Sequence, residues 1–168
     1  MKTSFHTPVA PALRMAVPSG DVEIDAGPGD TTEITIETPN HDEDRWRIDM
    51  SERSGRPLIE INPPGRVRFR SGRATLRISC PEGSDLEFLG GSTDLIARGA
   101  VGAARVRSAS GDVDVERAQG PVRVETASGV VRIGDSAQTL DVRGFRGNKP
   151  MEWKLQVKEM PPPEALPR

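Results

Sequence analysis

The chain contains 168 residues, which is enough for one domain with its own hydrophobic core. Hydrophobic residues make up only 35% of it, and the 17 glycines and 15 prolines favour short strands and turns over helices. The 23 basic and 25 acidic residues nearly cancel, so the net charge of −2 gives no general attraction to nucleic acid or to acidic membranes. The single cysteine, Cys80, excludes an internal disulfide, and the alternation around it predicts that it is buried.

The N-terminal residues lack the apolar run of a signal peptide, and no segment approaches the roughly 18 apolar residues of a membrane span. As written, the sequence therefore predicts a cytoplasmic protein. A secreted or surface protein from which a signal has been removed would have the same sequence, so that alternative stays open.

The first predicted elements lie in residues 5–29 and introduce a nine-residue rhythm. Two apolar pairs, nine positions apart, flank a Ser-Gly corner: Leu13/Met15 and Val22/Ile24. Inward-facing apolar pairs separated by a glycine-bearing corner are typical of short stacked strands. We therefore expect this segment to form the first rung of a repeat array.

Residues 30–83 interrupt this rhythm with longer alternating segments, which we interpret as a β-hairpin insertion packed beside the first rung. The predicted strands are the runs Ile34–Ile36, Trp46–Ile48, Leu58–Ile61, Val67–Phe69 and Ala74–Ile78. The clusters of proline, asparagine and glycine between them have the composition of turns.

The regular repeat occupies residues 84–142, where a pair of apolar residues recurs every nine positions. The seven pairs are Leu86/Phe88, Leu95/Ala97, Ala104/Val106, Val113/Val115, Val122/Val124, Val131/Ile133 and Leu140/Val142. Glycines keep the same spacing, at Gly102, Gly111, Gly120 and Gly129. This pattern predicts an all-β, β-solenoid or β-helix-like fold with two strands in each coil of about 18 residues.

Residues one coil apart would lie on neighbouring parallel strands, so their outward charges test the arrangement. Three sets carry opposite charges: Arg107/Glu125/Arg143, Arg98/Glu116 and Asp114/Arg132. One pair, Arg105 and Arg123, carries like charges. Because opposite charges on neighbouring strands are favourable, the balance favours parallel stacking over an up-and-down meander.

The rhythm fails after Val142, because Lys149-Pro150 occupies the place where a strand would begin. The first 144 residues are thus predicted to form one β-solenoid-like domain. An open end of stacked strands exposes unpaired backbone, so we interpret residues 145–158 as a capping strand. The candidate residues for capping or self-association are Trp153, Leu155 and Val157. Residues 159–168 are rich in proline and are predicted to be a disordered tail.

Three Ser-Gly units carry a resemblance to a known family: Ser19–Ile24, Ser110–Val115 and Ser128–Ile133. They resemble the bacterial "putative adhesin" β-strand-repeat domains of unknown function, and the opening Phe5–Pro8 is similar to the start of such domains. The likeness covers the chain from Phe5 to about residue 144. It implies a β-solenoid fold and no established enzyme activity.

Gly-Asp corners also occur in calcium-binding β-rolls, so Asp94 and Asp112 require an explicit interpretation. The second glycine of calcium-binding repeats is missing here, and the equivalent residue of the next coil is Val130. The same two carboxylates would also be the acidic groups of a glycan-binding or glycan-cleaving face. Turn formation is the simpler role. We assign no catalytic residue, no metal ligand and no cofactor.

The densest basic feature is a stripe of arginines, which we take as a candidate site for an anion or an acidic partner. Its members are Arg66, Arg68, Arg70, Arg73 and Arg77. Alternate positions on a strand would place the first three on one face, where guanidinium groups bind phosphate or carboxylate. The alternative is an ordinary solvated face answered by the acidic residues Asp42, Glu43, Asp44 and Glu52.

Together these features predict a non-catalytic β-repeat scaffold, an adhesin-like interaction module and not an enzyme. The expected partner is another protein or a further copy of the chain, bound through strand faces and edges. The alternative function is that of a carbohydrate-binding or carbohydrate-active β-helix protein, with a glycan as partner. Nucleic acid is not an expected partner, because aromatic stacking residues are scarce.

Overall fold

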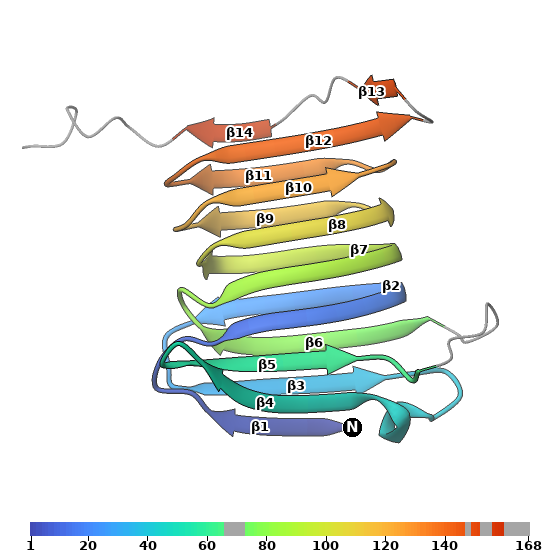
Figure 1. Ribbon diagram of the computed structural model, residues 1–168, viewed down its shortest axis with the longest axis vertical. Coiled ribbons are helices and arrows are strands. Elements are labelled where there is room, and N and C mark those ends of the chain that lie inside the picture. Colours follow the sequence, from blue (N-terminus) through green and yellow to red (C-terminus); the bar gives the residue numbers. More distant parts are fainter. Residues whose placement is uncertain (66–72, 147–148, 152–155, 160–168) are drawn as a thin grey trace, which may run out of the picture.

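The computed structural model describes residues 1–65, 73–146, 149–151 and 156–159, and in it the chain is all-β, as predicted. The described residues form fourteen strands in one open sheet, together with one short 3-10 helix, η1 (Glu43–Arg45). Figure 1 shows the strands stacked along the long axis of the molecule. Among these residues no helix is long and apolar enough to cross a membrane.

Two long strands, β2 (Ala12–Gly27) and β7 (Asp85–Val101), divide the sheet into two ladders, because each pairs with different strands along its two halves. Their first halves belong to ladder A, with β4 (Arg47–Arg53), β5 (Arg56–Asn62), β8 (Ala104–Ser110), β10 (Val122–Thr126), β12 (Leu140–Arg146) and β13 (Lys149–Met151). Their second halves belong to ladder B, with β1 (Lys2–His6), β3 (Thr31–Glu37), β6 (Ala74–Pro81), β9 (Val113–Ala118), β11 (Val131–Ser136) and β14 (Gln156–Glu159).

From β7 to β12, neighbouring strands of each ladder are parallel and pair one repeat apart. In ladder A, Val122 lies opposite Ala104 on one side and Leu140 on the other. In ladder B, Val113 lies opposite Leu95. Both offsets equal the 18 positions that separate hydrogen-bonded corner residues of successive coils.

Residues 30–83 continue both ladders beyond β2. The strands β5 and β6 are parallel to the first and second halves of β2, respectively. The strands β4 and β5 form a hairpin around Ser54 and Gly55, both of which have positive φ. The strands β1, β3 and β6 are joined by antiparallel pairing. The insertion is therefore one hairpin plus two further strands; the predicted strand at 67–69 lies outside the described residues.

Two short strands are described at the C-terminal end, one on each ladder. The strand β13 is antiparallel to β12, with Met151 opposite Gly144. The strand β14 is parallel to β11, with Val157 opposite Ile133. Residues 160–168 lie outside the described residues.

The inward-facing residues of both ladders form one hydrophobic core. The six apolar pairs from Leu86/Phe88 to Val131/Ile133 are buried, and Leu140 and Val142 pack against the core while remaining partly exposed. Cys80 is also buried, as predicted. Buried hydroxyl groups form hydrogen bonds within the protein. The Thr93 hydroxyl, for example, donates to the carbonyl oxygen of Val17 at 2.6 Å. The two ladders thus share a single core.

The corners between strands depend on glycine because residues 18 positions apart lie in close contact there. Gly111 has a φ of +112°, and a Cβ there would lie 2.2 Å from the carbonyl oxygen of Thr93. Gly129 has a φ of +119°, and its Cβ would lie 2.0 Å from the carbonyl oxygen of Gly111. Only glycine combines this backbone conformation with so close an approach.

The predicted pairing of Arg98 with Glu116 is wrong, because a β-bulge shifts the register. The pairing of β7 with β9 slips between Ala97 and Ala100. Arg98 instead lies opposite Asp25 of β2, with its guanidinium 3.7 Å from that carboxylate. The Glu116 carboxylate accepts a hydrogen bond from a backbone N–H of β7.

Candidate functional site

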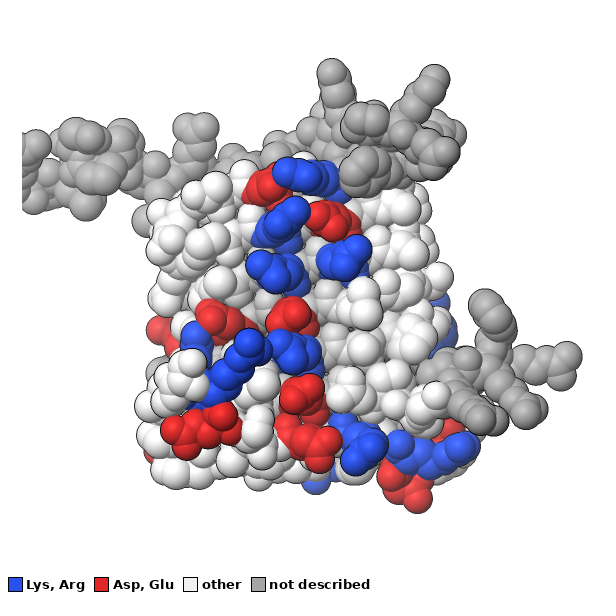
Figure 2. Space-filling view, viewed as in Figure 1, with Lys and Arg blue, Asp and Glu red and all other residues white. Residues whose placement is uncertain are grey.

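The outer face of ladder A carries a column of charged side chains, one from each successive strand. The strand registers place them opposite one another in the order Glu60, Arg14, Glu87, Arg105, Arg123 and Asp141. We call these six residues the charged column. A second row, two residues further along the strands, contains Leu89, Arg107, Glu125 and Arg143. In Figure 2, acidic and basic side chains form a band along the long axis, with uncharged surface on either side in the upper half of the view and charges spread more widely below.

Ion pairs engage most of the charges on this face. The Arg14 guanidinium lies 3.2 Å from the Glu87 carboxylate. Glu125 is shared: its carboxylate lies 3.1 Å from Arg123 and 3.4 Å from Arg107. The Arg107–Glu125 ion pair is one of those expected from the sequence. Exposed pairs of this kind contribute only about 0.2–1 kcal/mol each to folding, so their main effect is to hold side chains in place.

Arg105 differs from the other arginines of the charged column. It is exposed and lies between Glu87 and Arg123 in the strand register. Within the described part of the chain, no ion pair or hydrogen bond engages its guanidinium, because Glu87 is held by Arg14 and Glu125 by Arg123. Neighbouring strands lie roughly 4.8 Å apart, so two arginines stand side by side. The five N–H donors of Arg105 remain available to a ligand.

A groove of about 470 Å³ follows the charged column. It is lined by residues from six strands in succession, β5, β2, β7, β8, β10 and β12, and by small apolar corner residues, Ala103 and Pro121 among them. A second hollow of about 390 Å³ shares Glu87, Arg105 and Arg123 with the first. Arg105 therefore stands between two adjoining hollows on the outer face of ladder A.

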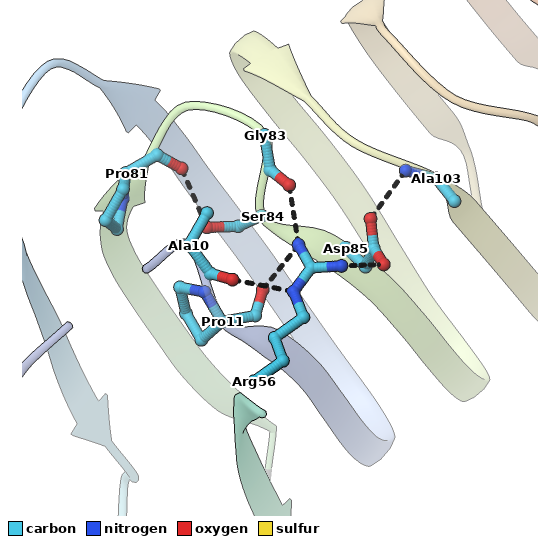
Figure 3. Close-up of polar contacts among 8 residues, drawn as sticks. All are labelled: Ala10, Pro11, Arg56, Pro81, Gly83, Ser84, Asp85 and Ala103. Carbon is cyan, nitrogen blue, oxygen red and sulfur yellow. Dashed lines mark hydrogen bonds and ion pairs between the residues drawn. The ribbon is translucent and has the colours of Figure 1, made fainter. Parts of the chain in front are cut away.

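Arg56, at the start of β5, anchors one end of this face (Figure 3). Its guanidinium donates to the carbonyl oxygens of Ala10 at 2.7 Å and Gly83 at 2.8 Å, and it forms an ion pair with Asp85. The other carboxylate oxygen of Asp85 accepts from the Ala103 N–H at 2.8 Å. Sequence reasoning missed this cluster, since its members are distant in sequence. Because its donors are used within the protein, Arg56 is a structural residue.

Three members of the predicted arginine stripe lie outside the described residues: Arg66, Arg68 and Arg70. The other two lie on ladder B, away from the groove. The Arg73 guanidinium is 3.4 Å from Asp21, and that of Arg77 is 4.0 Å from Glu23. Both acids belong to β2 and not to the acidic residues 42–44 and 52 expected from the sequence.

Asp94 and Asp112 are engaged in the corners. A carboxylate oxygen of Asp94 accepts from the Asp112 N–H at 2.7 Å, and one of Asp112 accepts from the Val130 N–H at 2.8 Å. These contacts match the turn role expected from the sequence. No cluster of three or more histidine, cysteine or acidic residues suited to a metal ion occurs among the described residues.

Cys80 and the predicted capping residues complete the positions singled out from the sequence. Burial raises the pKa of the Cys80 thiol from its usual 9.0 to about 11, so the group is protonated at neutral pH and is a poor nucleophile. Of the capping residues, Val157 lies in β14 against ladder B. The other two, Trp153 and Leu155, lie outside the described residues.

The fold is shared with a solved bacterial protein. The crystal structure of a putative cell adhesion protein from Clostridium sporogenes matches with a TM-score of 0.66 and 11% identity, covering 95% of this chain and 99% of that one. The resemblance predicted from the sequence is confirmed at the level of the fold. Putative adhesins from Bacteroides fragilis and Parabacteroides merdae match over 95% and 96% of this chain and 96% of each of theirs, with TM-scores of 0.37 and 0.33 and identities of 11% and 8%. No family model and no curated protein matches the sequence.

Proposed function

We propose that this chain is a non-catalytic, adhesin-like interaction module that binds a protein partner along the outer face of ladder A. The observation that carries this proposal is the charged column with the groove beside it. The shared fold with the Clostridium sporogenes protein, described as a putative cell adhesion protein, supports an adhesive role. Fold alone does not decide function, so the proposal rests on the face and its residues.

We further infer that the two ladders are the two faces of a β-solenoid, in which each coil contributes one strand to each face. The parallel registers and the single shared core support this arrangement. Paired cysteines test it in a Cys80→Ala background. Cysteines replacing Arg105 and Arg123, on adjacent strands, should form a disulfide, whereas cysteines replacing Arg105 and Asp114, on different faces, should not. Equal cross-linking of both pairs would contradict the solenoid.

The carbohydrate alternative has less support. Its acidic residues, Asp94 and Asp112, each have one carboxylate oxygen engaged by backbone N–H groups. Among the described residues, the lining of the groove contains no aromatic side chain on which a sugar ring would stack. Release of reducing ends from a panel of polysaccharides, above the level of a heat-denatured control, would overturn the proposed non-catalytic role.

Two matched variants test the use of ladder A. The first replaces three arginines of ladder A with serine: Arg105, Arg107 and Arg123. The second makes the same change on ladder B: Arg98, Arg117 and Arg132. Proteins retained by the immobilised wild-type chain should be lost with the first variant and kept with the second. Loss with both variants, or with neither, would contradict binding through ladder A.

A further inference from the structure

We propose that the groove beside the charged column binds an extended peptide segment carrying one isolated carboxylate, which pairs with Arg105. This inference rests on the proposed function and identifies the chemistry that ladder A recognises. Arg105 is the exposed arginine of the column that no ion pair engages within the described residues. A carboxylate of a partner would receive two parallel hydrogen bonds from its planar guanidinium.

The neighbouring charges favour a single anion over a polyanion. Along the column, Glu87 precedes Arg105, and Asp141 follows Arg123. A nucleic acid or an acidic polysaccharide carries a charge on every unit, and its further charges would face these two carboxylates. A lone carboxylate at Arg105 avoids that repulsion and relieves the like-charge contact between Arg105 and Arg123.

The shape of the groove suits an extended chain. Its lining comes from six successive strands, and at a spacing of about 4.8 Å these span roughly 24 Å. An extended peptide rises about 3.3 Å per residue, so about seven residues fill that length. Ala103 and Pro121 give the groove a small, apolar border that suits short aliphatic side chains. Leu89, which is 57% exposed, extends the apolar surface beside Arg107.

The test uses two labelled, C-terminally amidated heptapeptide libraries with alanine, serine, threonine and valine at the outer six positions. The central residue is glutamate in one library and glutamine in the other. Fluorescence anisotropy with the full chain should show the glutamate library binding about tenfold more tightly, and the difference should shrink in about 0.5 M salt. Equal binding of the two libraries would overturn the proposal.

Protein variants assign the effect to Arg105. Arg105→Gln should remove the preference for glutamate, and Arg105→Lys should keep part of it, since lysine retains the charge but not the planar fork. The matched control is Arg132→Gln, on the outer face of ladder B, which should leave the preference unchanged. Both positions are exposed, so unfolding midpoints should match the wild type.

Other outcomes also decide the question. A similar loss in Arg105→Gln and Arg132→Gln would overturn the proposal, as would tighter binding of oligogalacturonate than of the glutamate library. The result is separable from the proposed function. If the ladder A arginine variant loses its retained partner while Arg105→Gln shows no change in peptide preference, the carboxylate subsite is wrong and binding through ladder A stands.

Discussion

The Asp94 carboxylate accepts a hydrogen bond from the backbone N–H of Asp112, 18 positions later in the chain. The Asp112 carboxylate accepts the same kind of bond from the backbone N–H of Val130, a further 18 positions along. Each bond links residues 18 positions apart and satisfies a backbone donor at a corner, where the strands themselves end. Asp94 and Asp112 therefore join neighbouring segments of the chain, and their carboxylates act on protein backbone.

Replacing Asp94 with alanine should lower the free energy of unfolding by about 1–2 kcal/mol, because the Asp112 N–H loses a charged acceptor. Asp94→Asn keeps an acceptor oxygen and should cost less. Urea denaturation measures both. Asp114→Ala, on β9, is the control, since Asp114 accepts no such backbone bond within the described residues. An equal loss at Asp94 and Asp114 would show that the corner bond is unimportant.

Gly111→Ala should destabilise the fold by at least about 2 kcal/mol, because it combines a strained φ with a clash against a neighbouring carbonyl. The matched control is Gly27→Ala, where a Cβ would meet no atom within 4 Å. That variant should change stability by less than about 1 kcal/mol. Thermal unfolding of both variants gives the comparison. A Gly111→Ala protein as stable as the wild type would mean that the backbone at residues 93 and 111 moves apart at little cost in free energy.

The sequence predicts the local features of this fold well, because they repeat. The apolar pairs identify the inward-facing residues, and alternation alone identifies Cys80 as buried. Within residues 84–142, the partner of an outward charge lies 18 positions further along the chain, as the Arg107–Glu125 ion pair shows. The prediction fails at Arg98 because a bulge adds residues between pairing positions, and apolar spacing does not reveal it.

The candidate site is harder to predict, because it crosses the insertion. Arg14 and Glu87 are 73 positions apart, and they meet only because β7 stacks directly on β2. No repeat spacing gives that register. The sequence does show Arg105 above Arg123, but as a conflict of like charges. Its meaning depends on Glu87 being held by Arg14, which is a consequence of tertiary structure.

Arg56→Ala should lower the free energy of unfolding by about 2–4 kcal/mol, because it leaves Asp85 without its cation and two carbonyls without a donor. Arg56→Lys should recover only part of this, since an ammonium group lacks the planar fork. The control is Arg73→Ala, whose more exposed ion pair with Asp21 contributes at most about 1 kcal/mol. Equal effects at Arg56 and Arg73 in urea denaturation would contradict the structural role of Arg56.

Cys80 should make stability depend on pH in the alkaline range. Its pKa is raised to about 11 in the folded chain, whereas the unfolded chain has the usual value near 9.0. The unfolded state therefore loses the proton first, and the contribution present below about pH 9 declines by roughly 2–3 kcal/mol as the pH rises to about 11. Urea denaturation across this range should show the decline in the wild type. Cys80→Ala should lack that component, and the same slope in both proteins would refute the assignment.

Removing residues 151–168 should cause the chain to assemble. The deletion takes away β14, which covers the edge of β11, and shortens β13 beside β12. It therefore exposes unpaired backbone groups of β11, and such edges pair with other chains. Light scattering on a sizing column should show a molar mass that rises with concentration more steeply than that of the full chain. Deleting only residues 160–168 keeps both strands and should leave the dependence of the molar mass on concentration the same as in the full chain. If the two truncated chains behave alike, β13 and β14 do not act as caps, and self-association through this end is excluded.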